Sequence, residues 1–221
     1  MKVRTVEFAG SLFDAGAPLP GDLPQVAFSG RSNVGKSSLI NVLLRRTRKK
    51  LARVSATPGK TRSLNFYLVN DRFFLVDLPG FGFAKASARS RQSWKALVED
   101  YLVGEPKLRG VVHLIDARHD PTVTDLEMVE FLATRGLPTL VVLTKMDKLK
   151  HLARKRTVAT AVERLNIDED QVLTCSSKTG EGREELLAAL DDLIGVDEDG
   201  QDQDGQDQEG RDQMEQDEIR P

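Results

Sequence analysis

The stretch GRSNVGKS, residues Gly30–Ser37, matches the phosphate-binding pattern Gly-x-x-x-x-Gly-Lys-Ser in full. It follows the apolar run PQVAFSG (Pro24–Gly30), which predicts a buried strand. It precedes KSSLINVLLRR (Lys36–Arg46), whose apolar residues recur at helical spacing. A glycine-rich loop between a strand and a helix binds phosphate groups because its N–H groups and the helix N-terminus point at the anion. A chance match in a glycine-rich turn is the alternative, and this context argues against it.

The loop assigns separate tasks to its residues. Gly30 and Gly35 let the backbone wrap tightly around the phosphates. Lys36 is expected to reach the β- and γ-phosphates, and the Ser37 hydroxyl is a hard oxygen ligand for Mg²⁺. The other residues expected to contact phosphate are Arg31, Ser32, Asn33 and Val34.

Strand and helix patterns alternate along the rest of the chain. Strands are expected at 62–70, 72–80, 110–118, 137–147 and 171–177, and helices at 91–102, 123–136, 151–166 and 181–194. Asn70 and Asp71 join the first two of these strands as a hairpin, and Thr124 with Glu127 predicts a capping box for the second helix. The pattern predicts an α/β fold, a doubly wound, mostly parallel sheet with one antiparallel edge strand and helices on both faces.

A second motif indicates which base accompanies the phosphates. TKMD (Thr144–Asp147) ends a buried strand, at the carboxyl edge of the sheet where the phosphate loop also lies. The Asp147 carboxylate can accept from guanine N1–H and the 2-amino group together, a pair that adenine lacks, and the Lys145 stem can lie over the base. CSSK (Cys175–Lys178) follows the last strand, and its N–H groups are expected to meet guanine O6. The expected guanine contacts are Thr144, Lys145, Met146, Asp147, Cys175, Ser176 and Ser177.

Cys175 itself has two interpretations. Its place after an apolar strand favours a small buried residue, whereas a redox thiol would need activating charges, and Lys178 is the one cation nearby in the sequence. One cysteine allows no internal disulfide, which favours the cytosol.

The stretch VDLPGFGF (Val76–Phe83) has the Asp-x-x-Gly form of a metal- and phosphate-sensing turn. Asp77 is expected to hold Mg²⁺ through a water, and the Gly80 N–H is expected to meet the γ-phosphate. Many nucleotide switches place a water-orienting Gln next, but Phe81 follows here. The expected contacts of this turn are Asp77, Leu78, Pro79 and Gly80.

TPGKT (Thr57–Thr61) supplies a threonine for Mg²⁺ between the two phosphate motifs. Thr61 is preferred over Thr57 because the nearby glycine allows close approach. The metal ligands are therefore expected to be Ser37, Thr61 and, through water, Asp77. The contacts expected in this segment are Gly59, Lys60, Thr61, Arg62 and Ser63.

Five runs together resemble the EngB family, also called YihA or YsxC, of the TrmE-Era-EngA-EngB-like GTPase superfamily. These runs are GRSNVGKSSLIN, TPGKTRSLNFY, DLPGFGFA, IDARHDP and TKMDKL, and the resemblance spans about Phe8 to Ile194. It implies a P-loop GTPase domain that binds GTP or GDP with Mg²⁺. It also implies a role in assembly of the large ribosomal subunit, with normal cell growth and division depending on it.

Hydrolysis without the glutamine is expected to be slow, because other groups must hold the attacking water. The residues expected to act in catalysis are Lys36, Thr61, Gly80 and Asn33. Similar GTPases with this asparagine and an apolar residue after Asp-x-x-Gly use K⁺, so one hypothesis is that Asn33 binds K⁺. The alternative is an asparagine that shapes the loop.

Charge is divided unevenly between the body and the C-terminal end. The 221 residues carry a net charge of −2, but the last 26 carry −9 and the rest +7. Basic clusters at Arg45–Arg62 and Lys145–Arg156 suit ribosomal RNA, and a solvated face is the alternative. The acidic tail is expected to be disordered, either inert or screening the basic surface in cis.

These patterns predict three regions: an N-terminal extension (1–23) packed on the domain, a GTP-binding domain (24–195) and the tail (196–221). No apolar run reaches the length of a membrane span, so we expect no membrane partner, a cytoplasmic location and a monomer. Two other functions remain open. One is a small-molecule P-loop kinase, against which the guanine motifs argue, and the other is a GTPase switch for tRNA modification or division machinery.

Overall fold

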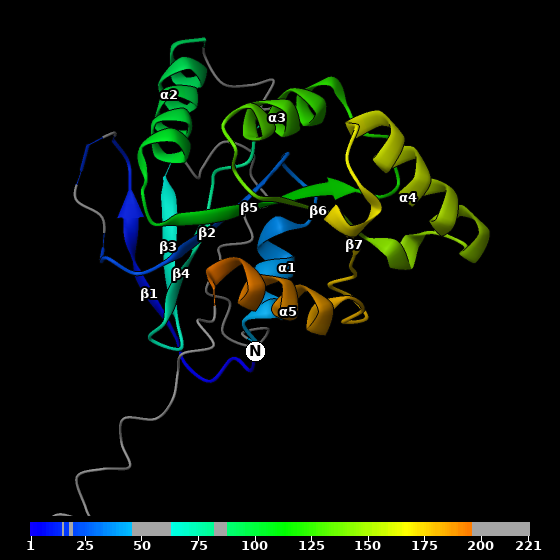
Figure 1. Ribbon diagram of the computed structural model, residues 1–221, viewed down its shortest axis with the longest axis horizontal. Coiled ribbons are helices and arrows are strands. Elements are labelled where there is room, and N and C mark those ends of the chain that lie inside the picture. The colour runs from blue at the N-terminus through cyan, green and yellow to red at the C-terminus, as the bar shows by residue number, and fades with distance from the viewer. Residues whose placement is uncertain (15, 18–19, 46–62, 82–87, 196–221) are drawn as a thin grey trace, which may run out of the picture.

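The computed structural model describes residues 1–14, 16–17, 20–45, 63–81 and 88–195, with side chains of helix α2 from 95 onward. Within these residues seven strands form one sheet in the order β1-β3-β4-β2-β5-β6-β7 (Figure 1). In chain order they are β1 (Val6–Leu12), β2 (Gln25–Gly30), β3 (Leu64–Val69), β4 (Phe73–Asp77), β5 (Leu108–Asp116), β6 (Thr139–Thr144) and β7 (Val172–Thr174).

Strand direction confirms the expected fold class. Strands β4, β2, β5, β6 and β7 are parallel neighbours, while β3 pairs antiparallel with both β4 and β1. Strand β3 therefore lies one place in from the edge, because β1 adds a further strand outside it. The β3–β4 turn is tight because Asn70 and Asp71 both take left-handed backbone angles, with φ of 53° and 56°.

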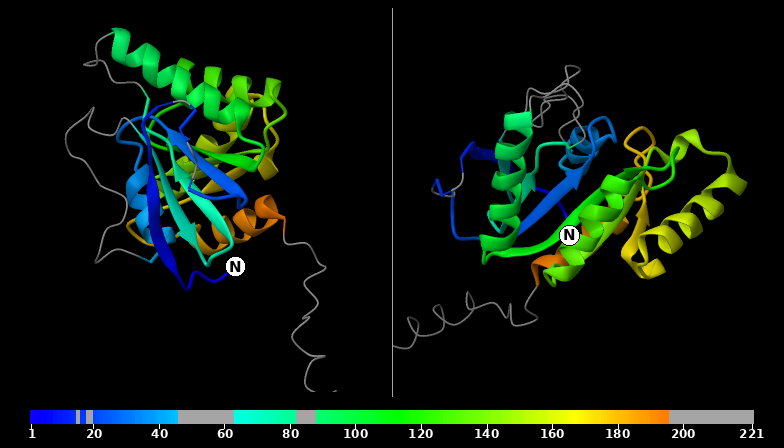
Figure 2. Two further views of the ribbon diagram at one scale, coloured as in Figure 1. Left: turned by 90° about the vertical axis from the view of Figure 1, so that its left-hand side faces the viewer. Right: turned by 90° about the horizontal axis from the view of Figure 1, so that it is seen from above.

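Helices cover both faces of the sheet, as the two further views show (Figure 2). Helices α1 (Lys36–Leu43) and α5 (Arg183–Ile194) lie on one face, and α2 (Ala88–Gly104), α3 (Val123–Thr134) and α4 (His151–Leu165) lie on the other. Two short 3-10 turns, η1 (Met146–Lys148) and η2 (Glu169–Gln171), precede α4 and β7.

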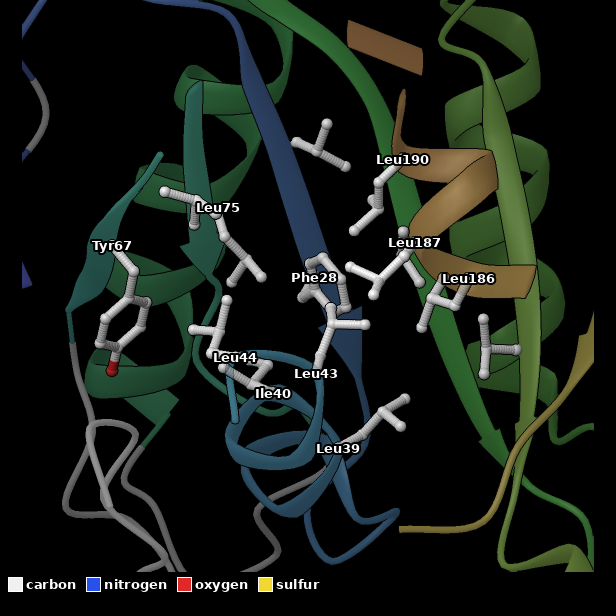
Figure 3. Packing of buried hydrophobic residues seen from close by; sticks show 14 of the residues in the cluster. Phe28, Leu39, Ile40, Leu43, Leu44, Tyr67, Leu75, Leu186, Leu187 and Leu190 are labelled. Atoms are coloured by element: carbon white, nitrogen blue, oxygen red, sulfur yellow. The ribbon is translucent and has the colours of Figure 1, made fainter. Parts of the chain in front are cut away.

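The core explains why the central strands read as continuous apolar runs. Phe28 of β2 packs with Leu43 of α1 and Leu187 of α5 on one face, while the next residue back, Ala27, joins the cluster under α2 (Figure 3). Successive side chains of a strand point to opposite faces, so a strand buried on both sides must be apolar throughout. This packing fixes the strand ends at which the loops of the site begin.

Helix α3 begins at Val123, the first residue of its expected range, but its capping box lies two residues before the predicted one. Thr122 is the N-cap and Asp125 the third helical residue, so the capping box is Thr122–Asp125 and the expected Thr124–Glu127 pair is wrong. Asp125 Oδ2 accepts from the Thr122 backbone N–H at 2.8 Å. Thr122 and Thr124 are each followed, three positions later, by an acidic residue. The local sequence therefore could not show which threonine caps the helix. In the observed capping box Asp125 is buried, with its side chain 2% exposed.

Candidate nucleotide-binding site

The phosphate loop is shaped by backbone angles that few residues accept. Gly30 ends β2 with φ of 151°, and a Cβ there would lie 2.8 Å from the carbonyl oxygen of Leu114. Asn33 and Gly35 also have positive φ, 68° and 104°, immediately before α1 begins at Lys36. The loop therefore wraps around the N-terminus of α1, the geometry that suits an anion.

Two side chains of the TKMD motif fasten this loop to strand β6. Thr144 Oγ1 donates to the carbonyl oxygen of Val34 at 2.6 Å, and the Lys145 ammonium donates to that of Asn33 at 2.5 Å. These bonds join residues more than 100 positions apart in the chain. The phosphate and guanine motifs, predicted separately, thus form one continuous surface.

Asp116 holds Lys145 in place, and sequence reasoning missed it. Lys145 Nζ lies 2.8 Å from Asp116 Oδ2, and Arg118 donates to the same carboxylate from both its guanidinium and its backbone N–H. Partial burial would raise the pKa of Asp116, but the hydrogen bonds from Arg118 and Lys145 hold it well below its usual range. Asp116 of β5 lies opposite Thr144 of β6, the residue before Lys145, so the strand register creates this contact. The register could not be predicted from the local sequence, and Asp116 was therefore missed.

Asp147 is oriented before any base arrives. Ser176 Oγ donates to Asp147 Oδ1 at 2.8 Å and accepts from the N–H groups of Lys178 and Thr179. The bond from Ser176 lowers the pKa of Asp147, so this residue is an anionic acceptor at neutral pH. Its other oxygen, Oδ2, lies 3.8 Å from the Lys148 ammonium and has no hydrogen-bond partner in the described parts of the chain. The arrangement presents a fixed carboxylate, as recognition of two guanine donors requires.

Cys175 agrees with the interpretation as a small buried residue. Its side chain is fully buried, and its Sγ lies 3.4 Å from the carbonyl oxygen of Gly182. Burial, with smaller contributions from Glu185 and Glu181, raises the pKa of the thiol to about 12, so it stays protonated at neutral pH. The backbone of this segment is anchored by Cys175 N–H to the Leu143 carbonyl at 2.8 Å.

The Asp-x-x-Gly turn closes against the phosphate loop. Lys36 and Asp77 form a nearly buried ion pair, and Ser32 N–H donates to the Phe81 carbonyl at 3.1 Å. Gly80 packs directly on Ser32, since a Cβ on Gly80 would lie 3.1 Å from Ser32 Oγ. Two groups expected to meet phosphate, the Lys36 ammonium and the Ser32 N–H, are thus paired with the turn.

Phe81 points into the protein, a placement that the sequence did not reveal. Its ring stacks on His113 of β5 with centroids 5.7 Å apart and planes 10° from parallel, and both side chains are buried. His113 Nδ1 shares a 2.8 Å hydrogen bond with Ser29 Oγ, and its Nε2 lies 3.4 Å from Asp125 Oδ1. Burial favours a raised pKa for Asp125, but the nearby His113 ring and the hydrogen bonds from Thr122 lower it. The sequence feature that could have singled out His113 is its position as a polar residue within an otherwise apolar strand pattern.

Some residues that were expected to contact the nucleotide lie outside the described residues, and others are buried. Gly59, Lys60, Thr61 and Arg62, with the alternative Thr57, lie outside the described residues. Leu78 and Met146 are each 1% exposed in the core, so only their backbones can face a nucleotide. Ser63 is buried and donates to Asn65 Oδ1 at 3.2 Å.

The donor set fits a magnesium ion held jointly with phosphates. Ser37 and Asp77 offer hard oxygen atoms, whereas no group of three or more His, Cys, Asp or Glu side chains among the described residues could hold a metal alone. Mg²⁺ commonly takes one or two protein ligands and completes its shell with substrate phosphate and water.

Among the residues that the structure describes, no helix is long and apolar enough to cross a membrane.

Comparison with known proteins decides the family. The model described as 50S ribosome-binding GTPase matches residues 25–145, and that of the elongation factor Tu GTP-binding domain matches 98–195. The probable GTP-binding protein EngB of Gemmatimonas aurantiaca is 48% identical over 197 residues, 89% of this chain and 96% of that protein. The chain belongs to the EngB family. The EngB protein of Pelotomaculum thermopropionicum is 47% identical, over 89% of this chain and 98% of its own length.

Solved structures agree with the EngB assignment. A crystal structure of a probable GTP-binding protein EngB superposes with a TM-score of 0.63 and 26% identity, covering 77% of this chain and 98% of that one. The G domain of the T. maritima FeoB iron transporter gives a TM-score of 0.51 and 26% identity, covering 79% of this chain and all of that one. This EngB-family chain is therefore a P-loop GTPase that binds GTP and GDP.

Proposed function

We propose that this GTPase is a nucleotide-gated factor in assembly of the large ribosomal subunit, with slow hydrolysis as the reset. The observation that carries the proposal is a basic surface beside the guanine motif, at the N-terminal end of α4. Lys150, Lys155 and Arg156 are exposed there and have no acidic partner in the described residues. Unpaired cations on a rigid helix suit the phosphates of RNA.

Not every cation of the Lys145–Arg156 cluster is available for RNA. Lys145 is bound to Asn33 and Asp116 inside the site, and Arg154 pairs with Glu181 at 2.7 Å. Of the Arg45–Arg62 cluster, only Arg45 lies among the described residues, where it is exposed. The RNA-binding surface that we propose therefore includes the whole Arg45–Arg62 segment but only the outer residues of the second cluster.

The matching family model adds support, because its description names binding to the 50S subunit. We further propose that the protein acts in the cytoplasm as a monomer and that growth and division depend on it. Residues 1–23, 24–195 and 196–221 would serve as extension, GTP-binding domain and acidic tail.

At the nucleotide we propose the division of labour that the motifs predict. Ser37 and Thr61 would bind Mg²⁺ directly and Asp77 through water, while Lys36 and the Gly80 N–H would meet the γ-phosphate. The Lys36–Asp77 pair supports this, since it already places the cation and the acidic group of the two motifs together. When bound, Mg²⁺ supplies positive charge to the β- and γ-phosphate oxygens.

A requirement for K⁺ is a separate part of the proposal. Asn33 is exposed at a positive φ of 68°, and its carbonyl oxygen is already bound by Lys145. This leaves the Asn33 side-chain oxygen as the group that would bind K⁺. Hydrolysis should then be faster in KCl than in NaCl at equal ionic strength, and equal rates would reject the idea.

Co-sedimentation with large ribosomal subunits tests the function. The protein should pellet with subunits in a GTP analogue, stay in solution with GDP, and dissociate steeply as salt rises. Changing both Lys155 and Arg156 to Gln should reduce the salt slope by about 2, because two RNA phosphates would no longer be neutralised. The matched control neutralises Lys95 and Arg109, exposed cations away from the site.

The same experiment discriminates the competing function. A GTPase switch for tRNA modification or division machinery would show no nucleotide-dependent pelleting with subunits. Binding that is indifferent to nucleotide, or equal loss in the Lys95 and Arg109 control, would also reject the proposal.

A further inference from the structure

Phe81 cannot hold the attacking water, because its side chain is engaged elsewhere. It is 5% exposed and stacked on His113, which Ser29 and Asp125 fix from two sides. Only the Phe81 backbone faces the phosphate loop, where its carbonyl accepts from Ser32 N–H and its N–H donates to the Gly30 carbonyl at 3.3 Å. The phosphate-loop group opposite this backbone is placed to hold the water in its stead.

Ser32 supplies a hydroxyl at this position. Its Oγ is shielded from solvent and has no hydrogen-bond partner in the described part of the chain. The nearest atom to a Cβ built on Gly80 is Ser32 Oγ, at 3.1 Å, so the hydroxyl lies against the glycine of the Asp-x-x-Gly turn. A buried hydroxyl without a partner costs about 1–3 kcal/mol, and such groups in native proteins call for an explanation such as catalysis.

Two other hydroxyls beside the loop are already hydrogen-bonded, and a third has a proposed role. Ser29 Oγ bonds to His113 Nδ1 at 2.8 Å, and Thr144 Oγ1 donates to Val34 at 2.6 Å. Ser37 is the proposed ligand of Mg²⁺. Ser32 differs from these three, because its hydroxyl has no hydrogen-bond partner among the described residues and no proposed metal role.

We propose that Ser32 is a catalytic residue whose hydroxyl orients the attacking water at the γ-phosphate. The proposal rests on the placement of the γ-phosphate at Gly80 that is proposed above. Ser32 Oγ accepts one proton of the water in a hydrogen bond and so directs a lone pair at phosphorus. The water oxygen then bonds to phosphorus, the bond from phosphorus to the β–γ bridging oxygen breaks, and the water proton passes to a γ-phosphate oxygen. The products are GDP and inorganic phosphate.

Hydrolysis of preloaded GTP in a single turnover tests this role. Ser32→Ala should slow the rate roughly tenfold, the effect of losing one hydrogen bond in the transition state. The affinities for GTP and GDP should change less than about twofold, because the hydroxyl contributes to the reaction rather than to binding. Ser32→Thr keeps the hydroxyl and should retain a rate within about threefold of the parent. Thr134→Ala, which removes a hydroxyl at the exposed end of α3, is the matched control.

Three results would overturn the proposal: an unchanged rate in Ser32→Ala, equal losses in the Ala and Thr variants, or a fall in GTP affinity that matches the fall in rate. If Ser32→Ala does not fold, Ser32→Gly takes its place, since glycine accepts any backbone angle. Pelleting with ribosomal subunits in a GTP analogue should be unchanged in these variants. A parent protein that fails to pellet would therefore reject the ribosomal function while leaving the comparison of rates interpretable.

Discussion

The two ends of the nucleotide site differ in how far they are assembled without ligand. At the guanine end, Asp147 is fixed by Ser176, and Lys145 is fixed by Asp116 and the Asn33 carbonyl. At the phosphate end, Lys36 is paired with Asp77 and the Ser32 N–H is bonded to Phe81. The first arrangement leaves Asp147 Oδ2 without a hydrogen-bond partner in the described residues, whereas the second pairs its phosphate-binding groups with the Asp-x-x-Gly turn.

The difference suits a small domain that is both selective and switchable. We expect the Asp147 carboxylate, held in one position, to recognise guanine with little reorganisation. We expect Lys36 and the Ser32 N–H to exchange their protein partners for phosphate, so that the turn at Asp77–Phe81 responds to the bound nucleotide. A switch requires such differential contacts in its two states.

Asp147→Asn should have the largest effect on nucleotide binding, because it removes the carboxylate that Ser176 holds in position. The amide has one acceptor oxygen and cannot receive both guanine donors as a carboxylate does, so affinity for GTP should fall roughly a hundredfold or more. Xanthosine triphosphate, which has a carbonyl where guanine has the amino group, should gain affinity. Competition against a fluorescent guanine nucleotide measures both changes.

Asp170→Asn is the matched control, since Asp170 is exposed in η2 beyond the site. Unchanged GTP binding in Asp147→Asn would show that the fixed carboxylate does not select the base.

Phe81→Ala should produce the next effect, and it concerns stability. Removing a nearly buried ring stacked on His113 leaves a cavity against β5, with a loss of about 3 kcal/mol in the free energy of unfolding. Urea unfolding measures it. Phe13→Ala, at a position that is 64% exposed, should stay within about 0.5 kcal/mol of the parent. Equal losses in both variants would contradict the anchoring role of His113.

Asp116→Asn should weaken nucleotide binding by a smaller factor, roughly fivefold, because Lys145 loses a charged partner but keeps the Asn33 carbonyl.

The ion pairs of Asp116 also predict how the stability of the protein depends on pH. The pKa of Asp116 is lowered by folding, so its stabilising contribution is present above the unfolded pKa of about 3.9 and disappears as pH falls toward the folded value. The stability difference between parent and variant should be constant from about pH 5 to 7 and shrink below about pH 4. A difference that grows on acidification would contradict the assignment.

Local sequence predicted the motifs well but could not predict what connects them. The phosphate loop, TKMD and CSSK are short runs whose context is strand, turn and helix, so their positions follow from the chain itself. The contacts of His113 with Ser29 and of Asp116 with Lys145 depend on the register between β2, β5 and β6, which joins residues far apart in the chain. The burial of Asp125 beside His113 depends on which of two threonines caps α3, and both threonines fit the local sequence pattern.

We propose that this GTPase positions its water without any help from the side chain of the residue after Asp-x-x-Gly. Phe81→Gln restores the amide that other switches use, and the single-turnover rate of GTP hydrolysis measures whether it matters. Unfolding temperature and GDP affinity, recorded alongside, confirm that the variant is folded. We expect a rate within about threefold of the parent, because the side chain at this position faces His113 rather than the phosphate loop. A rate increase of about tenfold or more would show that the missing amide was the deficit, and it would contradict this proposal.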